Sequence, residues 1–482
     1  MLSRAPRTLA SIGIVGITQV FTIILYQVVM VLLARALTPN DFGTYALCLV
    51  FINLATTTSM FGLDAAVIYR QSAVEEAFRT AATMRTAFAV VAATLFFLLS
   101  APLARFLESD ELIWAFRVAS LTFVVSAIGF ESSTRLSKSL RFRSLSITKI
   151  TYQVVWSASA LALAYLGWHF WSMLYAYFIG TAAMLLALWH FQPWKIRFEI
   201  NSGVARELLR YGVFSMGSAI LAFLVWNMDK IVIERYLDTS LLGIYWIAFT
   251  YGIVSPSIFT NVVNSVMFPT LSGLQDDKEA LKIRYSLTLK YLAYVSIPIG
   301  VGLAATSNTF VTALFGSEWK QAAIPLSVFS IVGILSCLNS PAVNIFLSTG
   351  RARTMFAISL VVTVPFLMFA IPSVVYGGMT GMALLFLAMM IAVFFWGYSK
   401  VAGILSFQRI AELSMLAKPA ISSLIMACVC LLLAGFFGTS LLSLVLQVAF
   451  GVAAYVACMT ALTRNQFIRE AKELVNGMLG KT

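Results

Sequence analysis

Residues 35–45 read Arg-Ala-Leu-Thr-Pro-Asn-Asp-Phe-Gly-Thr-Tyr, and residues 235–245 read Arg-Tyr-Leu-Asp-Thr-Ser-Leu-Leu-Gly-Ile-Tyr. Arginine, leucine, glycine and tyrosine fall at the same four places in both, although only the first copy has the pair Pro39 and Asp41. Each stretch closes one long apolar run and opens the next, so we expect the shared glycine and tyrosine to serve tight helix junctions. Duplication of this kind is typical of membrane transporters, and it predicts a protein built from two related halves.

The composition is that of a membrane protein. The chain has 482 residues, of which 60% are hydrophobic and 11% charged, and its mean hydropathy is +0.90. A soluble protein of this size cannot bury so much apolar surface, so lipid must surround most of it. Apolar runs of spanning length predict about fourteen transmembrane helices. Their approximate limits are 11–34, 42–63, 83–106, 112–133, 150–167, 171–191, 211–233, 240–268, 287–308, 322–347, 354–376, 379–400, 416–436 and 440–462.

The distribution of basic residues gives the predicted orientation. If the N-terminus is cytoplasmic, all but six of the 33 lysines and arginines fall on the cytoplasmic side, as the positive-inside rule requires. We therefore predict an all-α polytopic membrane protein with both termini in the cytoplasm. Two pseudo-symmetric six-helix lobes would occupy residues 1–195 and 196–403, and residues 404–482 would hold two further helices and a cytoplasmic tail.

Neither catalysis nor a metal centre is indicated. The five cysteines lie inside apolar runs, the chain has only two histidines, and no catalytic motif occurs. The predicted outer loops are too short to carry the groups of a membrane glycosyltransferase, polymerase or ligase. We expect a protein that is not an enzyme and holds no metal or cofactor. Because membrane topology explains the net charge of +13, no nucleic-acid partner is expected.

Ionisable residues in or beside predicted spans are the candidate functional residues, because their burial in lipid is costly. The span at 211–233 contains Asp229 and Lys230 and is followed by Glu234 and Arg235. Lys230 and Glu234 are four residues apart and can form an ion pair on a helix, with Asp229 facing another direction. The alternative is that Lys230 or Arg235, with Asp229 nearby, faces a central cavity and binds an anionic group.

Arg35 and Arg235 are related by the repeat and can frame a site for phosphate, which arginine binds in a planar, bidentate geometry. Arg117, early in the fourth predicted span, can add to this site. The alternative is that both repeat arginines extend to the membrane interface. Asp64 and Glu131, each near the end of a span, either pair with basic neighbours or bind a coupling cation, a proton or Na⁺.

A basic segment lies between two predicted spans. Arg135, Lys138 and Arg141 recur at three-residue steps among apolar residues, and Arg143 follows. This pattern is typical of a helix that lies at the membrane interface against anionic headgroups. We expect membrane lipids to bind to it.

The pattern of residues 35–45 resembles the opening signature of the Wzx-type polysaccharide flippases of the MOP superfamily. Residues 229–245 are similar to the region of helices 7 and 8 in that family, and so are residues 268–277 and 314–319. The resemblance covers nearly the whole chain. These motifs are mainly helix-junction and packing signatures, so they specify the family better than the substrate.

The resemblance implies a flippase in the bacterial inner membrane. Such proteins are expected to move an undecaprenyl-diphosphate-linked oligosaccharide to the outer leaflet by alternating access, for exopolysaccharide, capsule or O-antigen synthesis. A proton or Na⁺ gradient would drive the step, and a polysaccharide polymerase and export machinery would be partners. By the same resemblance, the apolar residues 424–437 and 441–456 would form a groove for the lipid tail.

Two other functions stay open on the same fold. One is a cation-coupled multidrug or metabolite antiporter, and the other is a flippase for peptidoglycan precursors. An antiporter would need a clear acidic ion site inside a lobe. The acidic residues available for it are Asp64, Glu131 and Asp229.

Overall fold

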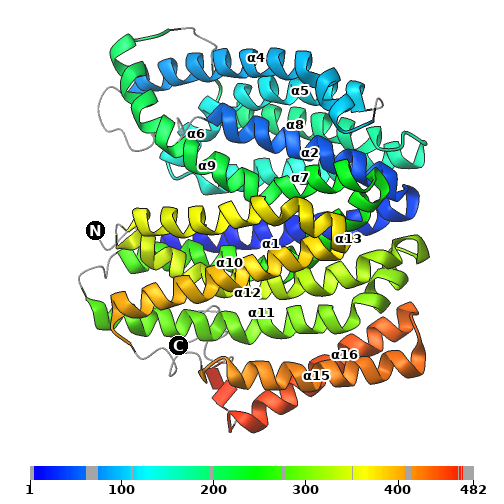
Figure 1. Ribbon diagram of the computed structural model, residues 1–482. Helices are drawn as coiled ribbons and strands as arrows, with labels where there is room; N and C mark the ends of the chain where they lie inside the picture. Colours follow the sequence, from blue (N-terminus) through cyan, green and yellow to red (C-terminus); the bar gives the residue numbers. More distant parts are fainter. Residues whose placement is uncertain are drawn as a thin grey trace. The chain divides into compact units, whose positions relative to one another are not determined.

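The computed structural model describes most of the chain. The described residues are 5–60, 74–109, 112–194, 199–272, 277–349, 351–407, 414–464, 466–467 and 469–470. All regular structure in these ranges is helical (Figure 1). Each of the apolar runs predicted to span the membrane coincides with helix over the described part of the run. The all-α prediction is therefore confirmed.

The chain divides into two compact units, which are described separately. The first unit comprises residues 1–246 and 363–379, and the second comprises 247–362 and 380–482. The predicted lobe boundaries after residues 195 and 403 stay a prediction. The helices that begin in the first unit are α1 (Ala5–Ala36), α2 (Pro39–Met60), α4 (Val74–Phe106), α5 (Leu112–Ile128), α6 (Phe130–Lys138), α7 (Phe142–Tyr165), α8 (Trp171–Phe191), α9 (Ser202–Tyr236) and α10 (Thr239–Ser272).

The remaining helices belong mainly to the second unit. They are α11 (Lys278–Leu314), the 3-10 helix η1 (Ser317–Ala322), α12 (Ala323–Ser348), α13 (Ala352–Leu405), α15 (Ala417–Phe437) and α16 (Leu441–Leu462). Helix α13 is broken at Gly378, whose φ of 57° and ψ of −149° are not helical. This positive φ suits glycine, and the break separates the two spans predicted at 354–376 and 379–400.

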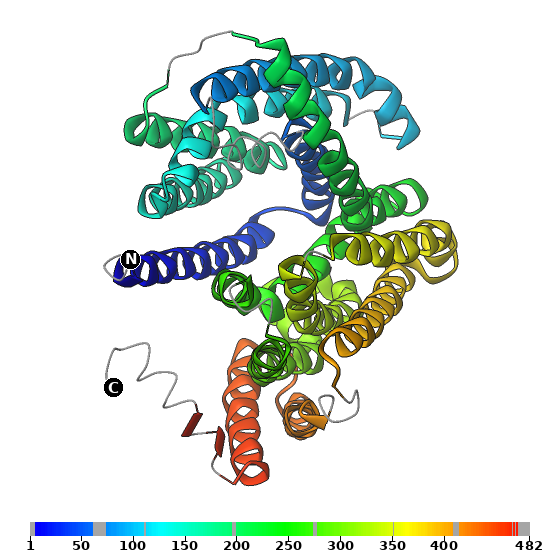
Figure 2. The same ribbon diagram turned by 90° about the vertical axis from the view of Figure 1, so that its left-hand side faces the viewer.

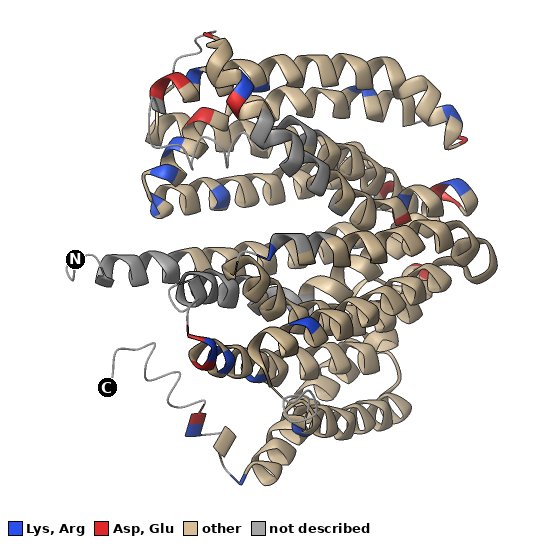
Figure 3. Cartoon of the chain, turned by 60° about the vertical axis from the view of Figure 1, so that its left-hand side comes forward, with Lys and Arg blue, Asp and Glu red and all other residues tan. Residues whose placement is uncertain are grey.

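The helices have the length and surface of membrane spans. Within the described residues, eight are long and apolar enough to cross a membrane, or nine if α5 and α6, bent by 41°, are one span. Helix α4 exposes Val91, Leu95 and Leu98, as lipid-facing helices do. Figure 3 shows long uncharged stretches of helix, with many of the charged residues near helix ends. The protein is a multi-pass membrane protein, and the predicted total of fourteen crossings stays a prediction.

The first unit is held together by helix pairs that pack side by side, among them α4 with α5, α1 with α7 and α7 with α8. An aromatic cluster joins three of its helices. The ring of Phe51 lies 4.6 Å from that of Phe96 and 4.5 Å from that of Phe116. Such tilted and edge-on contacts are favourable geometries for buried aromatic rings.

The second unit brings helix backbones into close contact. A Cβ atom added to Gly333 on α12 would lie 2.6 Å from the carbonyl oxygen of Gly252 on α10. Small residues allow this approach, which gives membrane helices their van der Waals contact. Figures 1 and 2 show α15 and α16, coloured orange to red, lying beside each other, and both pack against α11.

Candidate functional site

The two copies of the repeat lie directly against each other in the first unit. A Cβ atom on Gly43 would overlap the carbonyl oxygen of Thr239, and one on Gly243 would overlap the carbonyl oxygen of Pro39. Pro39 and Thr239 occupy corresponding places in the repeat, so the contact is reciprocal. Only glycine lets the first turns of α2 and α10 approach this closely.

Aromatic residues pack around this contact. The ring of Trp246 lies 5.9 Å from the rings of both Phe42 and Tyr45. Tyr45 and Tyr245 are both buried. Gly43 and Gly243 thus lie inside α2 and α10 and serve the close contact between the two copies. Their predicted role in the turn between consecutive helices, and that of the tyrosines, stays a prediction.

The same position caps the helix in each copy. In the first copy Thr38 Oγ1 accepts the amide of Asp41 at 3.3 Å. Asp41 Oδ2 accepts hydrogen bonds from the amide and the hydroxyl of Thr38, at 2.9 and 2.8 Å. Asp41 Oδ1 also accepts one from the amide of Phe170, at 2.9 Å, which joins the start of α2 to the start of α8. In the second copy, Asp238 Oδ1 accepts the amide of Leu241 at 2.7 Å. The N-cap therefore stands at the same place in both copies, and the first copy adds the reciprocal bonds of a capping box, which the leucine at 241 cannot form.

Asp229 and Lys230 form a buried cluster with Tyr245. The Nζ atom of Lys230 lies 3.1 Å from Asp229 Oδ1 and donates to the carbonyl oxygen of Trp226 at 2.8 Å. The hydroxyl of Tyr245 donates to Asp229 Oδ2 at 2.8 Å. Asp229 is fully buried and Lys230 is 5% exposed. These contacts tie α9 to the first turns of α10.

The predicted ion pair between Lys230 and Glu234 is wrong, and Asp229 does not face away from Lys230. The flexible lysine side chain folds back along α9 and reaches the neighbouring Asp229, a pairing that helical spacing alone does not favour. Glu234 instead accepts a hydrogen bond from the hydroxyl of Thr239, at 2.7 Å. A substrate role for Asp229 and Lys230 stays a prediction.

The two repeat arginines have different surroundings. Arg35 is exposed at the end of α1. Arg235 is partly buried, and its Nη1 atom lies 2.8 Å from Oε1 of Glu108, in the connection between α4 and α5. Its guanidinium also lies 5.7 Å from the centre of the Phe106 ring. The structure therefore does not bring the two guanidinium groups into equivalent environments.

Arg117 and Glu131, two further candidate residues, have partners of their own. The guanidinium of Arg117 lies over the rings of Trp114 and Phe97, at 4.8 and 5.2 Å. Glu131 pairs with Arg135 at 2.9 Å, so the structural pairing predicted as one alternative is confirmed. Asp64 lies outside the described residues. The proposed role of these residues in substrate binding or ion coupling stays a prediction.

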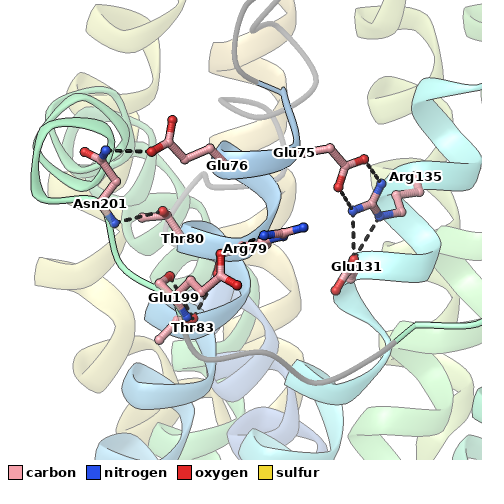
Figure 4. A network of polar contacts seen from close by, with 9 residues as sticks. All are labelled: Glu75, Glu76, Arg79, Thr80, Thr83, Glu131, Arg135, Glu199 and Asn201. Atoms are coloured by element: carbon pink, nitrogen blue, oxygen red, sulfur yellow. Dashed lines mark hydrogen bonds and ion pairs between the residues drawn. The ribbon is translucent and has the colours of Figure 1, made fainter.

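A polar network joins α4 to α6 and to the residues that lead into α9 (Figure 4). The two terminal guanidinium nitrogens of Arg135, Nη1 and Nη2, donate to the carboxylate of Glu75 at 2.6 and 2.7 Å. Arg79 pairs with Glu199 at 2.8 Å, and Asn201, which caps α9, binds Glu76. Arg135, expected at lipid headgroups, therefore forms ion pairs within the protein. Sequence reasoning missed this network because most of its partners are far apart along the chain.

An apolar groove lies among α11, α15 and α16 in the second unit. Its volume is about 480 Å³. Leu303, Met426 and Val448 are among its lining residues. Gly302 and Gly451 also line it, and each packs closely against a side chain of α15. The groove predicted between residues 424–437 and 441–456 thus has α11 as a third wall, which the sequence did not indicate. Its use by a lipid tail stays a prediction.

Comparison with solved structures defines the class of fold. The inward closed conformation of the lipid II flippase MurJ matches with a TM-score of 0.76 and 16% identity, over 97% of this chain and 100% of that one. The inward-facing conformation of a multidrug resistance MATE family transporter of the MOP superfamily matches with a TM-score of 0.62 and 16% identity. That match covers 80% of this chain and 98% of the transporter. The chain has the MOP transporter fold.

The family follows from sequence. The model of the family described as "Polysaccharide biosynthesis protein" matches residues 32–324. The chain belongs to this family, and the resemblance to the Wzx-type proteins is confirmed.

Curated relatives match over most of the chain. The lipopolysaccharide biosynthesis protein WzxC of Escherichia coli (strain K12) is 26% identical over 383 residues, which are 78% of this chain and 76% of that protein. The succinoglycan biosynthesis transport protein ExoT of Rhizobium meliloti (strain 1021) is 27% identical over 427 residues, 88% and 85% of the two chains. The teichuronic acid biosynthesis protein TuaB of Bacillus subtilis (strain 168) is 28% identical over 301 residues, 61% and 62%.

Proposed function

We propose that this protein is a flippase that moves a lipid-linked oligosaccharide across the membrane for surface polysaccharide synthesis. The observation that carries the proposal is the family match over residues 32–324. The relatives named for lipopolysaccharide, succinoglycan and teichuronic acid biosynthesis support it, because all three are named for the synthesis of a surface polymer and one of them is named as a transport protein.

The groove among α11, α15 and α16 supports a substrate with a long apolar tail. The tail of a polyprenyl lipid can stay in an apolar groove that opens towards the bilayer, while the polar part crosses elsewhere. The groove is lined almost wholly by apolar residues. Burial of a hydrocarbon chain in it would be favourable, whereas burial of a sugar would cost the hydrogen bonds that its hydroxyls make with water. On this proposal the substrate is an undecaprenyl-diphosphate-linked repeat unit in the bacterial inner membrane.

A proton or Na⁺ gradient is the energy source that we propose. In alternating access, a bound ion can shift the equilibrium between the inward-open and outward-open states. A carboxylate within a transmembrane span is the usual group that binds a proton or Na⁺. Glu131 and Asp64 remain the candidates. Because Glu131 is held by Arg135, its exchange of a proton or Na⁺ would have to compete with that ion pair.

Deletion of the gene in its host tests the proposal. We expect the lipid-linked oligosaccharide to accumulate on the cytoplasmic leaflet, where a glycosidase or lectin added to intact spheroplasts does not reach it. Lysed spheroplasts are the control that shows the same material to be reactive. If the intermediate is fully accessible from outside in the deletion strain, the protein does not move it.

The rival function is a multidrug antiporter, which the fold of the MATE transporter allows. Under that function, the deletion strain would make normal surface polysaccharide and become sensitive to cationic compounds. The flippase proposal expects the opposite pattern, with loss of polymer and unchanged sensitivity. A plasmid copy of the gene should restore whichever property was lost.

A further inference from the structure

The apolar groove among α11, α15 and α16 has two tyrosines at one end. Tyr294 on α11 and Tyr455 on α16 line this end, and the hydroxyl of Tyr455 donates to the carbonyl oxygen of Tyr294 at 2.9 Å. The predicted orientation places it towards the cytoplasm. Along α11 the lining runs from Tyr294 to Phe310, about 24 Å at 1.5 Å per residue. A lipid of the cytoplasmic leaflet with its tail in the groove would have its headgroup near Tyr294.

A cation lies beside this end of the groove. Lys290 precedes Tyr294 by one turn of α11, and its Nζ atom is 5.6 Å from the centre of the Tyr294 ring. The ring of Tyr291 is at a similar distance, 5.8 Å. An ammonium group next to an apolar groove is complementary to a lipid that has an anionic headgroup and a hydrocarbon tail.

The C-terminal segment, the described residues within 463–470, reaches the same end of the groove. After α16 the chain passes through Arg464, whose φ of 48° lies in the left-handed region that residues other than glycine seldom adopt. The ring of Phe467 then lies 5.4 Å from that of Tyr294 and 6.4 Å from that of Tyr455. The chain has therefore turned back, and the segment packs against the two tyrosines that end the groove.

The same segment supplies a carboxylate to the cation. Oε1 of Glu470 accepts a hydrogen bond from Nζ of Lys290 at 2.6 Å and another from Nε2 of Gln466 at 2.8 Å. The side chains of Lys290 and Glu470 are 18% and 16% exposed. A carboxylate and a phosphate are both oxyanions that bind a lysine ammonium by charge-assisted hydrogen bonds. A phosphate at this end of the groove would therefore compete with Glu470 for Lys290.

The C-terminal segment can open at low cost. It follows the last long helix, and terminal segments open locally with small free energies. The left-handed backbone at Arg464 costs free energy in a residue that is not glycine. An ion pair that is partly exposed gives back only part of this cost. Closed and open positions of the segment are therefore both accessible.

We propose that Lys290 binds the diphosphate of a polyprenyl lipid whose tail lies in the groove, and that Glu470 inhibits this binding while the C-terminal segment is closed. The choice of lipid rests on the proposed function, to which the inference adds a headgroup residue and a form of regulation. A diphosphate carries more negative charge than the phosphodiester of a phospholipid, so it competes better with a tethered carboxylate.

The test measures binding of undecaprenyl diphosphate, without sugar, to the full chain in nanodiscs of phosphatidylcholine. The midpoint of thermal unfolding, followed as the lipid fraction is raised, gives the affinity. Glu470→Gln should tighten binding about fivefold, because Lys290 is then available in a larger fraction of molecules. Lys290→Gln should bind about tenfold more weakly than Glu470→Gln, the effect of one lost charge-assisted hydrogen bond. In the Lys290→Gln background, Glu470→Gln should have little further effect.

A second ion pair on α11 provides the matched controls. Glu279 and Lys282 lie 3.5 Å apart, and neither is among the residues that line the groove. Glu279→Gln and Lys282→Gln make the same changes of charge and should leave the affinity unchanged. Phe467→Ala loosens the C-terminal segment without a change of charge and should also tighten binding. It keeps the test informative if Glu470→Gln does not fold.

Three results would overturn the proposal. The first is equal affinity of the wild type, Glu470→Gln and Phe467→Ala, and the second is equal affinity of Lys290→Gln and Glu470→Gln. The third is binding of phosphatidylglycerol with the same affinity and the same response to the variants, which would make the ligand a phospholipid. None of these results bears on transport. The flippase function fails separately, if the wild type does not move a labelled lipid-linked oligosaccharide in liposomes.

Discussion

The start of α2 and the start of α10 have the same glycine contact, but the second has the buried ion pair of Asp229 and Lys230 beside it. Asp229 and Lys230 form their cluster in the second copy, where the first copy has Val29 and Met30 at the corresponding positions. Both of those apolar residues are buried as well. The comparison teaches that the duplicated halves kept their backbone packing and diverged in polar chemistry.

A buried ion pair is a poor source of stability, because desolvation of the charges offsets their attraction. The first copy shows that apolar residues can occupy the same places. The ions in the second copy therefore need a reason other than packing, which is why Asp229 and Lys230 remain candidates for function. The predictions below separate the shared packing from the polar chemistry.

The largest expected effect comes from removing one partner of the ion pair. Asp229→Ala leaves Lys230 buried without its carboxylate and should cost about 3–5 kcal/mol, measured as a lower midpoint of thermal unfolding in detergent. The matched variant takes the residues of the first copy, Asp229→Val with Lys230→Met, together with Tyr245→Phe so that no hydroxyl loses its acceptor. It should regain most of the stability. An Asp229→Ala protein as stable as the wild type would contradict this account.

The glycine contact should be the next most sensitive feature. Gly43→Ala and Gly243→Ala each place a methyl group against a backbone carbonyl that cannot move aside, and each should cost about 1–3 kcal/mol. Gly435→Ala on α15 is the control, because a Cβ atom there meets nothing within 4 Å. Fluorescence-detected size exclusion after heating compares the three variants. Equal stability of all three would show that the two copies do not touch in this way.

The helix caps should differ in a smaller and graded manner. Asp41→Ala removes the bonds that the Asp41 carboxylate accepts from Thr38 and the link to Phe170, so it should cost about 1–2 kcal/mol. Asp238→Ala removes a cap alone and should cost about 1 kcal/mol. Thermal unfolding of the two variants side by side gives the difference. If Asp238→Ala is the more damaging change, the contact with Phe170 does not contribute to stability.

The smallest effect on stability is expected at the repeat arginines. The ion pair of Arg235 with Glu108 is largely exposed, and such pairs contribute less than about 1 kcal/mol. Arg35→Ala and Arg235→Ala should therefore insert and fold normally, yet each should reduce translocation of the lipid-linked oligosaccharide. Glu108→Ala is the control for loss of the ion pair alone. Normal surface polysaccharide in both arginine variants would remove these residues from the substrate site.

The sequence predicted the features that depend on apolar length and on local repetition. The helices α1, α15 and α16 could be predicted from the length of their apolar runs alone. The helix lengths are local features, so one stretch of sequence contains all the information for them. The contact of Gly43 with Thr239 and of Gly243 with Pro39 joins the two copies and was not predicted.

Features that depend on distant partners were not predictable in the same way. The pairing of Arg135 with Glu75 joins positions that only the fold brings together. The position of Lys230 was mispredicted because a long lysine side chain can reach several partners, and helical spacing alone does not choose among them. A cavity of about 360 Å³ that Arg85 and Lys149 line in the first unit was missed for a related reason, because its lining comes from five helices.

Reconstituted transport is the most direct test of the claim that the protein is a flippase. Purified protein is placed in liposomes that contain a polyprenyl-diphosphate-linked oligosaccharide with a fluorescent label on the sugar, and dithionite is added outside. We predict that dithionite bleaches nearly all of the label with protein present, and only the outer-leaflet portion in protein-free liposomes. The same extent of bleaching with and without protein, under an imposed proton or Na⁺ gradient, would contradict the account.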